Sequence, residues 1–289
     1  MHATQHLNPS QQQGRIRKSV LLSLRYLVCG VIAFFVLIPI VTAIIGGFKS
    51  NAELASFPFS LPTTWHWQNY GSILAAGTFW QSITNSLITT LATVGLLLLV
   101  ASPASFILAR VPFRGHKIVL SIALLGLLFP IYMAILPLYI TLRNLSLLNT
   151  LPGVILPQIA YALPPTILIL HNFFRAIPQE LEDATYIDGG SSLDFFWYIL
   201  LPLARPALAV VSMLAMVNSW NNFLLPLLAL NSSNLWTLPL GVMQFQGEFA
   251  TNWPAVMAFV SLTIVPAIIF YLFAERHLIA GLTAGAVKG

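Results

Sequence analysis

Residues 177–206 read IPQELEDATYIDGGSSLDFFWYILLPLARP, a polar block within an otherwise apolar chain. Five of the eight acidic residues among the 289 lie in it: Glu180, Glu182, Asp183, Asp188 and Asp194. Pro178 suits the first turn of a helix, and acidic side chains next to it stabilise the positive N-terminal end of that helix. Gly189 and Gly190 predict where the helix stops, because glycine tolerates a left-handed cap.

A second short helix is predicted after the glycines. Ser191 opens Ser-Ser-Leu-Asp, with Asp194 three residues on, which is a form of capping box. This helix carries Phe195, Phe196, Tyr198 and Ile199, and we expect it to end before Pro202. A solvated loop would explain the acidic residues but neither the glycine turn nor exposed aromatic side chains. A docking element, covered by a partner with basic groups, explains all three.

The composition outside this block is that of a membrane protein. Hydrophobic residues make up 57% of the chain and charged residues 7%, against about 25% charged in soluble domains. The net charge of +5 does not indicate nucleic acid, because the basic residues lie at the ends of apolar runs. Cys29 is the only cysteine, so an intrachain disulfide is excluded. We predict an all-α, polytopic membrane protein.

Six transmembrane helices follow from apolar runs of roughly the 20 residues needed to cross a bilayer. They cover about 22–47, 83–109, 118–141, 150–171, 204–230 and 254–275. The connection 48–80 holds several aromatic residues that we expect at the membrane surface: Trp65, Trp67, Tyr70 and Trp80. Prolines within the spans predict bent helices around a cavity, as in a transporter, although membrane helices are in any case richer in proline.

The distribution of lysine and arginine predicts the orientation. With the N-terminus in the cytoplasm, eleven of the thirteen basic residues lie on the cytoplasmic side, and only Lys49 and Arg143 lie outside. The polar N-terminal tail 1–21 precedes a first apolar run that is too long for a signal peptide. Both tails, 1–21 and 281–289, and the block at about 172–203 are therefore expected in the cytoplasm.

The block resembles the EAA loop of ABC-type importer membrane subunits. That pattern is Glu-Ala-Ala, three residues, Gly, nine residues and Ile-x-Leu-Pro. The positions that match it here are Asp183, Ala184, Thr185, Gly189, Ile199, Leu201 and Pro202, with the spacing kept in full. Asp183 in place of Glu keeps the charge, and Thr185 in place of Ala keeps helix compatibility. The resemblance implies that these residues, with Glu180, Glu182, Asp188 and Gly190, couple the chain to an ATPase.

The resemblance extends over nearly the whole chain. The lead-in IPQEL, the Ser219-Trp220-Asn221 segment and the tail GLTAGAVKG are similar to the carbohydrate-importer branch, in particular to MalG-like maltose-permease subunits. It implies a type I ABC importer permease fold over 22–280, in the cell inner membrane. It also implies contacts with the ATPase through a run in the tail, consisting of Gly281, Leu282, Thr283, Ala284 and Gly285.

The partners and cargo follow from the same resemblance. Such complexes pair two homologous permease subunits with two ATPase subunits and an external solute-binding protein. They import a carbohydrate, a polyol or a related glycoside. ATP and Mg would be bound by the partner ATPases, so no cofactor is expected in this chain.

Catalytic chemistry has no support in the sequence. A Walker A pattern and a Gly-x-Ser-x-Gly elbow are both absent, and the six histidines lack metal-ligand spacing. We therefore predict no catalytic residue, no metal ligand and no enzyme activity of its own. A membrane-embedded enzyme is the weakest of three hypotheses.

A solute path is the remaining candidate site. Asn218, Ser219, Trp220, Asn221 and Asn222 lie together in the fifth predicted span and suit hydrogen bonding and stacking with a hydroxyl-rich solute. Alternatively, they hydrogen-bond to neighbouring helices. No acidic or basic residue lies in mid-span, which counts against an ion-gradient-driven secondary carrier, the second hypothesis.

Overall fold

The structure is a computed structural model that describes the backbone of residues 9–247 and 251–286. Over these residues the chain is helical, and its only strand pairing is the isolated bridge between Gln246 and Thr251. The predicted all-α class is therefore confirmed. The chain divides into two compact units, residues 1–70 with 252–261 and residues 71–251 with 262–289.

The first unit is built around α1 (Pro9–Gly46), which begins within the predicted tail 1–21. Its apolar part, Leu21–Gly46, is long enough to cross a membrane. The short helix α2 (Asn51–Ser56) follows, and α3 (Gln68–Ala75) begins at the end of this unit. Tyr70 ties the unit together, because its Oη donates to the Ile44 carbonyl at 2.8 Å and lies 2.8 Å from Ser261 Oγ in α14 (Trp253–Ala286).

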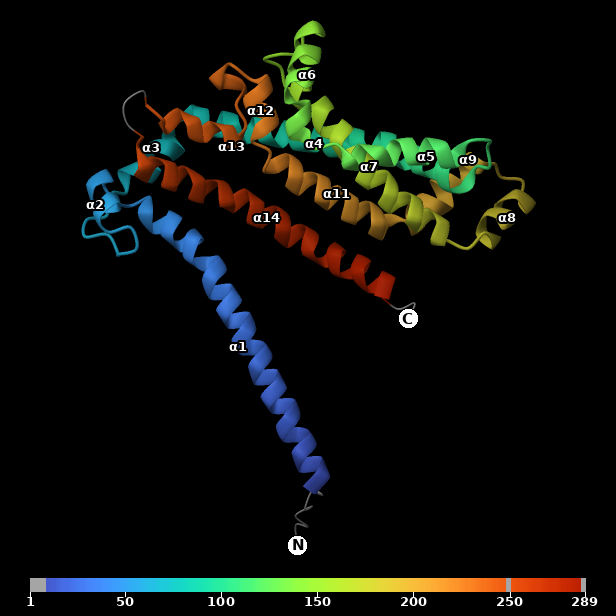
Figure 1. The fold of residues 1–289 in the computed structure, drawn as a ribbon, viewed down its shortest axis with the longest axis horizontal. Helices are drawn as coiled ribbons and strands as arrows, with labels where there is room; N and C mark the ends of the chain where they lie inside the picture. Colours follow the sequence, from blue (N-terminus) through green and yellow to red (C-terminus); the bar gives the residue numbers. More distant parts are fainter. Residues whose placement is uncertain (1–8, 248–250, 287–289) are drawn as a thin grey trace. The chain divides into compact units, whose positions relative to one another are not determined.

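The second unit is built around α4 (Gly77–Arg110), α7 (Pro152–Ala176) and α11 (Arg205–Trp220), which pack against one another (Figure 1). Their buried faces form one apolar core that extends into the polar block. This core includes Leu97, Ala101, Phe106, Leu170, Phe174, Phe195, Phe196, Leu200, Ala207 and Val211. The block at 177–203 is therefore part of the packed structure rather than a loose connection.

The third predicted span, 118–141, is not one helix. Instead, α5 (His116–Leu125) and the 3₁₀ turn η1 (Gly126–Leu128) are followed by α6 (Ile131–Asn144), with a bend of 102°. The break lies at Phe129, which has extended backbone angles of −84° and 109° and precedes Pro130. Proline disfavours helical geometry in the residue before it, which explains the break.

The fifth predicted span, 204–230, is also interrupted. Helix α11 ends at Trp220, and α12 (Leu224–Ala229) begins after a break at residues 221–223. Asn222 Oδ1 accepts the Leu225 N–H at 3.0 Å, so a side chain caps the second piece. Asparagine competes in this way with helical hydrogen bonding. Loop residues 231–252 contain three short elements, η3 (Ser233–Leu235), α13 (Leu238–Gly241) and η4 (Val242–Phe245).

The described residues contain three single helices that can cross a membrane: Leu21–Gly46, α4 and α7. Two bent pairs, His116–Leu128 with Ile131–Asn144 and Ser192–Leu203 with Arg205–Trp220, raise the number to five if each is one broken span. The predicted sixth span falls in α14, whose described apolar part is shorter, Trp253–Ile269. Six spans therefore remain a prediction.

Candidate functional site

The first helix of the polar block is α8 (Glu180–Ile187), with Glu180, Glu182 and Asp183 in its first turn as predicted. It closes in a Schellman motif: the Gly189 N–H donates to the Tyr186 carbonyl at 3.1 Å, and the Gly190 N–H to the Thr185 carbonyl at 2.8 Å. Gly189 has a φ of +82°. A Cβ on Gly190 would lie 2.7 Å from Thr185 Cγ2. Each glycine is thus required for a different reason.

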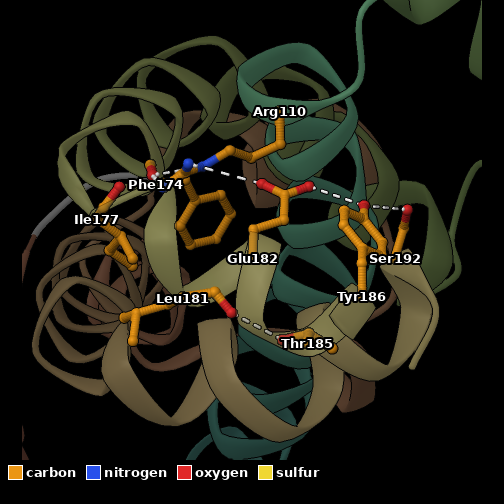
Figure 2. Close-up of polar contacts among 8 residues, drawn as sticks. All are labelled: Arg110, Phe174, Ile177, Leu181, Glu182, Thr185, Tyr186 and Ser192. Carbon is orange, nitrogen blue, oxygen red and sulfur yellow. Dashed lines mark hydrogen bonds and ion pairs between the residues drawn. The ribbon is translucent and has the colours of Figure 1, made fainter. Parts of the chain in front are cut away.

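The predicted capping box is present at α9 (Ser192–Asp194). Ser191 Oγ accepts the Asp194 N–H at 3.3 Å, and Asp194 Oδ2 accepts the Ser191 N–H at 2.8 Å. Tyr186 links the two helices, because its Oη donates to Glu182 Oε1 at 3.0 Å and lies 2.8 Å from Ser192 Oγ (Figure 2). The turn is therefore held by its own side chains as well as by its backbone.

The second helix does not end before Pro202, contrary to the prediction. A π-helical stretch, η2 (Phe195–Leu200), continues into α10 (Leu201–Leu203). The Leu201 N–H reaches back five residues to the Phe196 carbonyl, and Pro202 then occupies an early position of α10. Early helical positions need no N–H donor, which is why proline fits there.

The aromatic residues of this helix are divided between the core and solvent. Phe195 and Phe196 are buried and pack against Phe106 of α4, with ring centroids 6.4 Å and 5.0 Å away. The expectation that these two rings are exposed is therefore wrong, because one helix face docks on the bundle. Trp197 and Tyr198, on the other face, are 58% and 77% exposed.

Arg110, the last residue of α4, fastens the block to the bundle (Figure 2). Its guanidinium donates twice to the Phe174 carbonyl, at 2.6 and 3.0 Å, and also to the Ile177 carbonyl. It lies 3.7 Å from the Glu182 carboxylate, and the two side chains are only 8% and 12% exposed. Sequence reasoning used Arg110 only to orient the chain and missed this role, although a basic residue at the end of a span was visible.

The other predicted coupling residues surround this anchor. Thr185 is buried and donates to the Leu181 carbonyl at 2.8 Å. Glu182 and Asp183 line a groove of about 870 Å³ together with Lys117, His171 and Arg175. Every other member of the predicted set is exposed or partly exposed: Glu180, Glu182, Asp183, Ala184, Asp188, Gly189, Gly190, Ile199, Leu201 and Pro202.

The predicted solute-path residues are only partly brought together. Asn218, Ser219 and Asn222 border a cavity of about 320 Å³ between α4, α7 and α11. Trp220 is buried and absent from its lining, and Asn221 is exposed and donates to the Val217 carbonyl at 3.0 Å. The two thus have local structural roles.

Gln158 is the central polar residue of this cavity, and sequence reasoning missed it. Its Oε1 accepts from Thr93 Oγ1 at 3.2 Å and from Ser219 Oγ at 2.5 Å, which joins the three helices. Its Nε2 is buried without a hydrogen-bond partner in the described structure. A single amide within the apolar run of the fourth predicted span was the available signal. The cavity is lined by amides, hydroxyls and apolar groups, with no charged residue.

The predicted tail contacts, Gly281, Leu282, Thr283, Ala284 and Gly285, fall within α14, which continues to Ala286. Their side chains lie outside the described ones.

Comparison with known proteins gives consistent relationships. The chain is 32% identical to the diacetylchitobiose uptake system permease protein NgcG of Streptomyces coelicolor, covering 88% of this chain and 84% of the relative. It is 36% identical to the arabinooligosaccharides transport system permease protein AraQ of Halalkalibacterium halodurans, over 89% of this chain and 93% of the relative. A solved bacterial ABC transporter involved in alginate import shares the fold, with a TM-score of 0.76 and 24% identity. The match covers 94% of this chain and 99% of that chain.

These relationships confirm the resemblance to ABC importer permeases and the membrane location inferred from the sequence. Residues 101–282 match the family of binding-protein-dependent transport system inner membrane components, and they include the polar block, its Arg110 anchor and most of the cavity. The chain belongs to the binding-protein-dependent transport system inner membrane component family.

Proposed function

We propose that this permease subunit imports a neutral carbohydrate or polyol and is driven by partner ATPases that dock on residues 172–203. The observation that carries the proposal is the anchored block, which presents an exposed face on a rigid base. This face, hereafter the docking face, consists of Asp183, Ile187, Asp188, Leu193, Trp197 and Tyr198.

The docking face has the composition of a protein interface. Its apolar members are strongly exposed, from 58% for Trp197 to 85% for Ile187. The acidic side chains of Asp183 and Asp188, from the same helix-turn-helix, are exposed as well. An apolar centre with a charged rim is typical of protein–protein contacts. The face therefore fits a partner with an apolar cleft and basic residues at its edge, which we take to be the ATPase.

The contacts behind the docking face explain how a movement of the partner would reach the transport path. Arg110 joins the block to the end of α4, and Phe195 and Phe196 join it to Phe106 on the same helix. Helix α11, which borders the cavity, follows directly after Ala204. Closure of two ATPases on ATP would thus move α4 and α11 together with the block.

The cavity supports a neutral, hydroxyl-rich cargo. Its volume of about 320 Å³ lies at the lower end of the range of about 300–1,000 Å³ for small-molecule sites. Amide and hydroxyl groups bind sugar hydroxyls without neutralising a charge. The relatives named for diacetylchitobiose and arabinooligosaccharides agree with a carbohydrate. An external solute-binding protein would deliver the cargo, and a second permease subunit would complete the path.

The orientation belongs to the same proposal. An ATPase partner requires the docking face to lie in the cytoplasm, and the lysine and arginine distribution predicts that both termini lie there too. The alternative, an ion-gradient-driven carrier, requires an ionisable site at membrane depth. The cavity offers none among its lining residues.

Loss of the docking face tests the ATPase partner. Ile187→Ser is expected to abolish co-purification of the ATPase subunits while the permease still inserts, because Ile187 is 85% exposed and carries no internal packing. Leu145→Ser, at an exposed leucine (61%) outside the docking face, is the control and should keep the complex intact. Undiminished ATPase recovery with Ile187→Ser would refute this docking face.

The energy source is tested in proteoliposomes that contain the whole complex and its solute-binding protein. Uptake of a labelled oligosaccharide is expected to require ATP inside and to continue when an ionophore collapses the proton gradient. Uptake that stops with the ionophore at constant ATP would favour the carrier.

A further inference from the structure

The loop after α2 is fastened to the end of α1 by a buried lysine. Lys49 is fully buried, and its Nζ donates to the Phe57 carbonyl at 2.6 Å and to the Pro58 carbonyl and Ser60 Oγ at 3.3 Å each. A buried ammonium group must be compensated by hydrogen bonds. Because Lys49 lies three residues after α1, these bonds hold the loop near the level at which α1 ends.

A second contact closes the same loop at its far side. Glu53 Oε1 accepts the Thr63 N–H at 2.6 Å, and this bond holds the pKa of the Glu53 carboxyl below its usual value. The Phe48 ring packs against Trp65, Trp67 and Tyr70, with centroids 4.4 to 5.2 Å apart. The loop is therefore held at both ends rather than free to collapse.

This fixed loop presents apolar side chains outward. Phe57, Phe59 and Leu61 are 66%, 80% and 69% exposed, and Trp67 beside them is 65% exposed. No Asp, Glu, Lys or Arg occurs between Glu53 and Arg110. Three large apolar side chains on an uncharged, pinned tip mark a contact surface.

The backbone of the tip has few free donors. Pro58 and Pro62 have no N–H. The Phe57 N–H donates to the Glu53 carbonyl and the Ser60 N–H to the Phe57 carbonyl. The Thr63 N–H donates to Glu53 Oε1. Within residues 57–63, only the N–H groups of Phe59 and Leu61 therefore remain without a protein acceptor. Lipid-exposed irregular backbone does not occur in the hydrocarbon region. A tip with few free donors therefore fits the interfacial layer, where water reaches its remaining polar groups.

We propose that residues 57–61 insert into the interfacial layer of the bilayer on the side where α1 ends. Leu21–Gly46 is long and apolar enough to cross the membrane, and the loop lies beside its C-terminal end (Figure 1). Trp65 and Trp67 then occupy the headgroup level, where aromatic rings are enriched. Tyr70 does not act as a surface anchor, because its hydroxyl bonds to Ile44 and Ser261 inside the unit. The proposal requires only that α1 spans the membrane and is independent of ATPase docking.

Depth measurement by spin labelling tests this anchor in the whole complex, reconstituted in phosphatidylethanolamine–phosphatidylglycerol vesicles. Single cysteines are introduced at Phe59, at Phe35 within the span and at Asn231 in an exposed loop, in a Cys29→Ser background. We expect the label at position 59 to relax more with oxygen than with a water-soluble nickel chelate, as at position 35. At position 231 the order should be reversed.

Two results would overturn the proposal. Nickel accessibility at position 59 equal to that at position 231 would place the tip in water. Protection from both oxygen and nickel would place it under another protein chain. Lys49→Met provides a second variant: it is expected to release the tip and raise nickel accessibility at position 59 several-fold, while position 35 stays unchanged.

Discussion

Replacing Arg110 by methionine should detach the polar block from the bundle without removing the docking face. Methionine keeps much of the apolar stem but donates no hydrogen bond. The change leaves the Ile177 carbonyl without its side-chain donor and Glu182 without its cation, and the Phe174 carbonyl keeps only the Ile177 N–H at 3.3 Å. Arg110 is 8% exposed, so water compensates only in part.

The magnitude follows from the three donated bonds. A hydrogen bond with a charged partner contributes about 1.5–3 kcal/mol, and Arg110 donates such bonds to two carbonyls, those of Phe174 and Ile177. We expect the block to lose about 3–5 kcal/mol of docking free energy. That loss raises its open population about a hundred- to several-thousand-fold, since about 1.4 kcal/mol is a factor of ten.

Glu182→Gln provides the contrast. The Arg110–Glu182 separation of 3.7 Å is too long for a hydrogen bond, and glutamine keeps an oxygen for Tyr186. We expect a loss of about 1 kcal/mol, because this long contact carries no hydrogen bond and the carbonyl contacts of Arg110 remain. Arg114→Met, at an exposed arginine four residues on, should have no effect.

Hydrogen–deuterium exchange of the amides at 186–195 reports the open population directly. The expected order of exchange rates is Arg110→Met far above Glu182→Gln, with Arg114→Met equal to the parent. Equal rates in Arg110→Met and the parent would show that apolar packing alone holds the block. Equal rates in Arg110→Met and Glu182→Gln would assign the anchor to the ion pair instead of the carbonyl contacts.

Three further predictions concern the turn, the cavity and the external loop. Gly189→Val should uncouple ATP hydrolysis from transport in an inserted complex, because a β-branched residue is strained by at least about 1–2 kcal/mol at φ +82°. Gly71→Val, where a side chain meets open space, is the control. Full coupling in Gly189→Val would contradict the reasoning. Gln158→Leu should lower solute uptake at least tenfold with ATPase recovery unchanged, whereas Asn221→Ala, which lies off the cavity, should leave uptake near that of the parent. The Glu53–Thr63 contact should be intact at neutral pH and lost in acid. The pKa of Glu53 is lower in the folded protein than its usual value of 4.5, so the ionised carboxylate stabilises the fold above pH 4.5. This stabilisation is lost as the pH falls through the folded-state pKa. Tryptophan fluorescence, measured as a function of pH, should show a transition in acid when the contact is lost, and this transition should be absent in Glu53→Gln.

The local chemistry of the polar block was readable from the sequence. The acidic first turn of α8, the left-handed Gly189 and the Ser191–Asp194 box each depend on residues within five positions of one another. Backbone preferences and side-chain caps act at that range, so no tertiary information was needed. The spacing of the same residues carried the resemblance that the family match confirmed.

Helix continuity in the membrane was less readable. Pro103, Pro157 and Pro164 lie inside unbroken helices, whereas Pro130 lies at a 102° bend. The bend lies close to α7: a Cβ on Gly126 would lie 2.6 Å from Pro164 Cγ. Whether a proline bends or breaks a helix depends on which neighbours receive the freed backbone groups, and the sequence alone does not name those neighbours.

By itself, the sequence determined the membrane class, the two-helix form of residues 177–203 and the family. Only the tertiary structure decided that Phe195 and Phe196 are buried, that Arg110 holds carbonyls 64 and 67 residues away, and that Gln158 joins Thr93 to Ser219. Caps and turns are fixed by neighbours along the chain. Burial and long-range hydrogen bonds are fixed by the packing of α4, α7 and α11, which brings distant residues to one place.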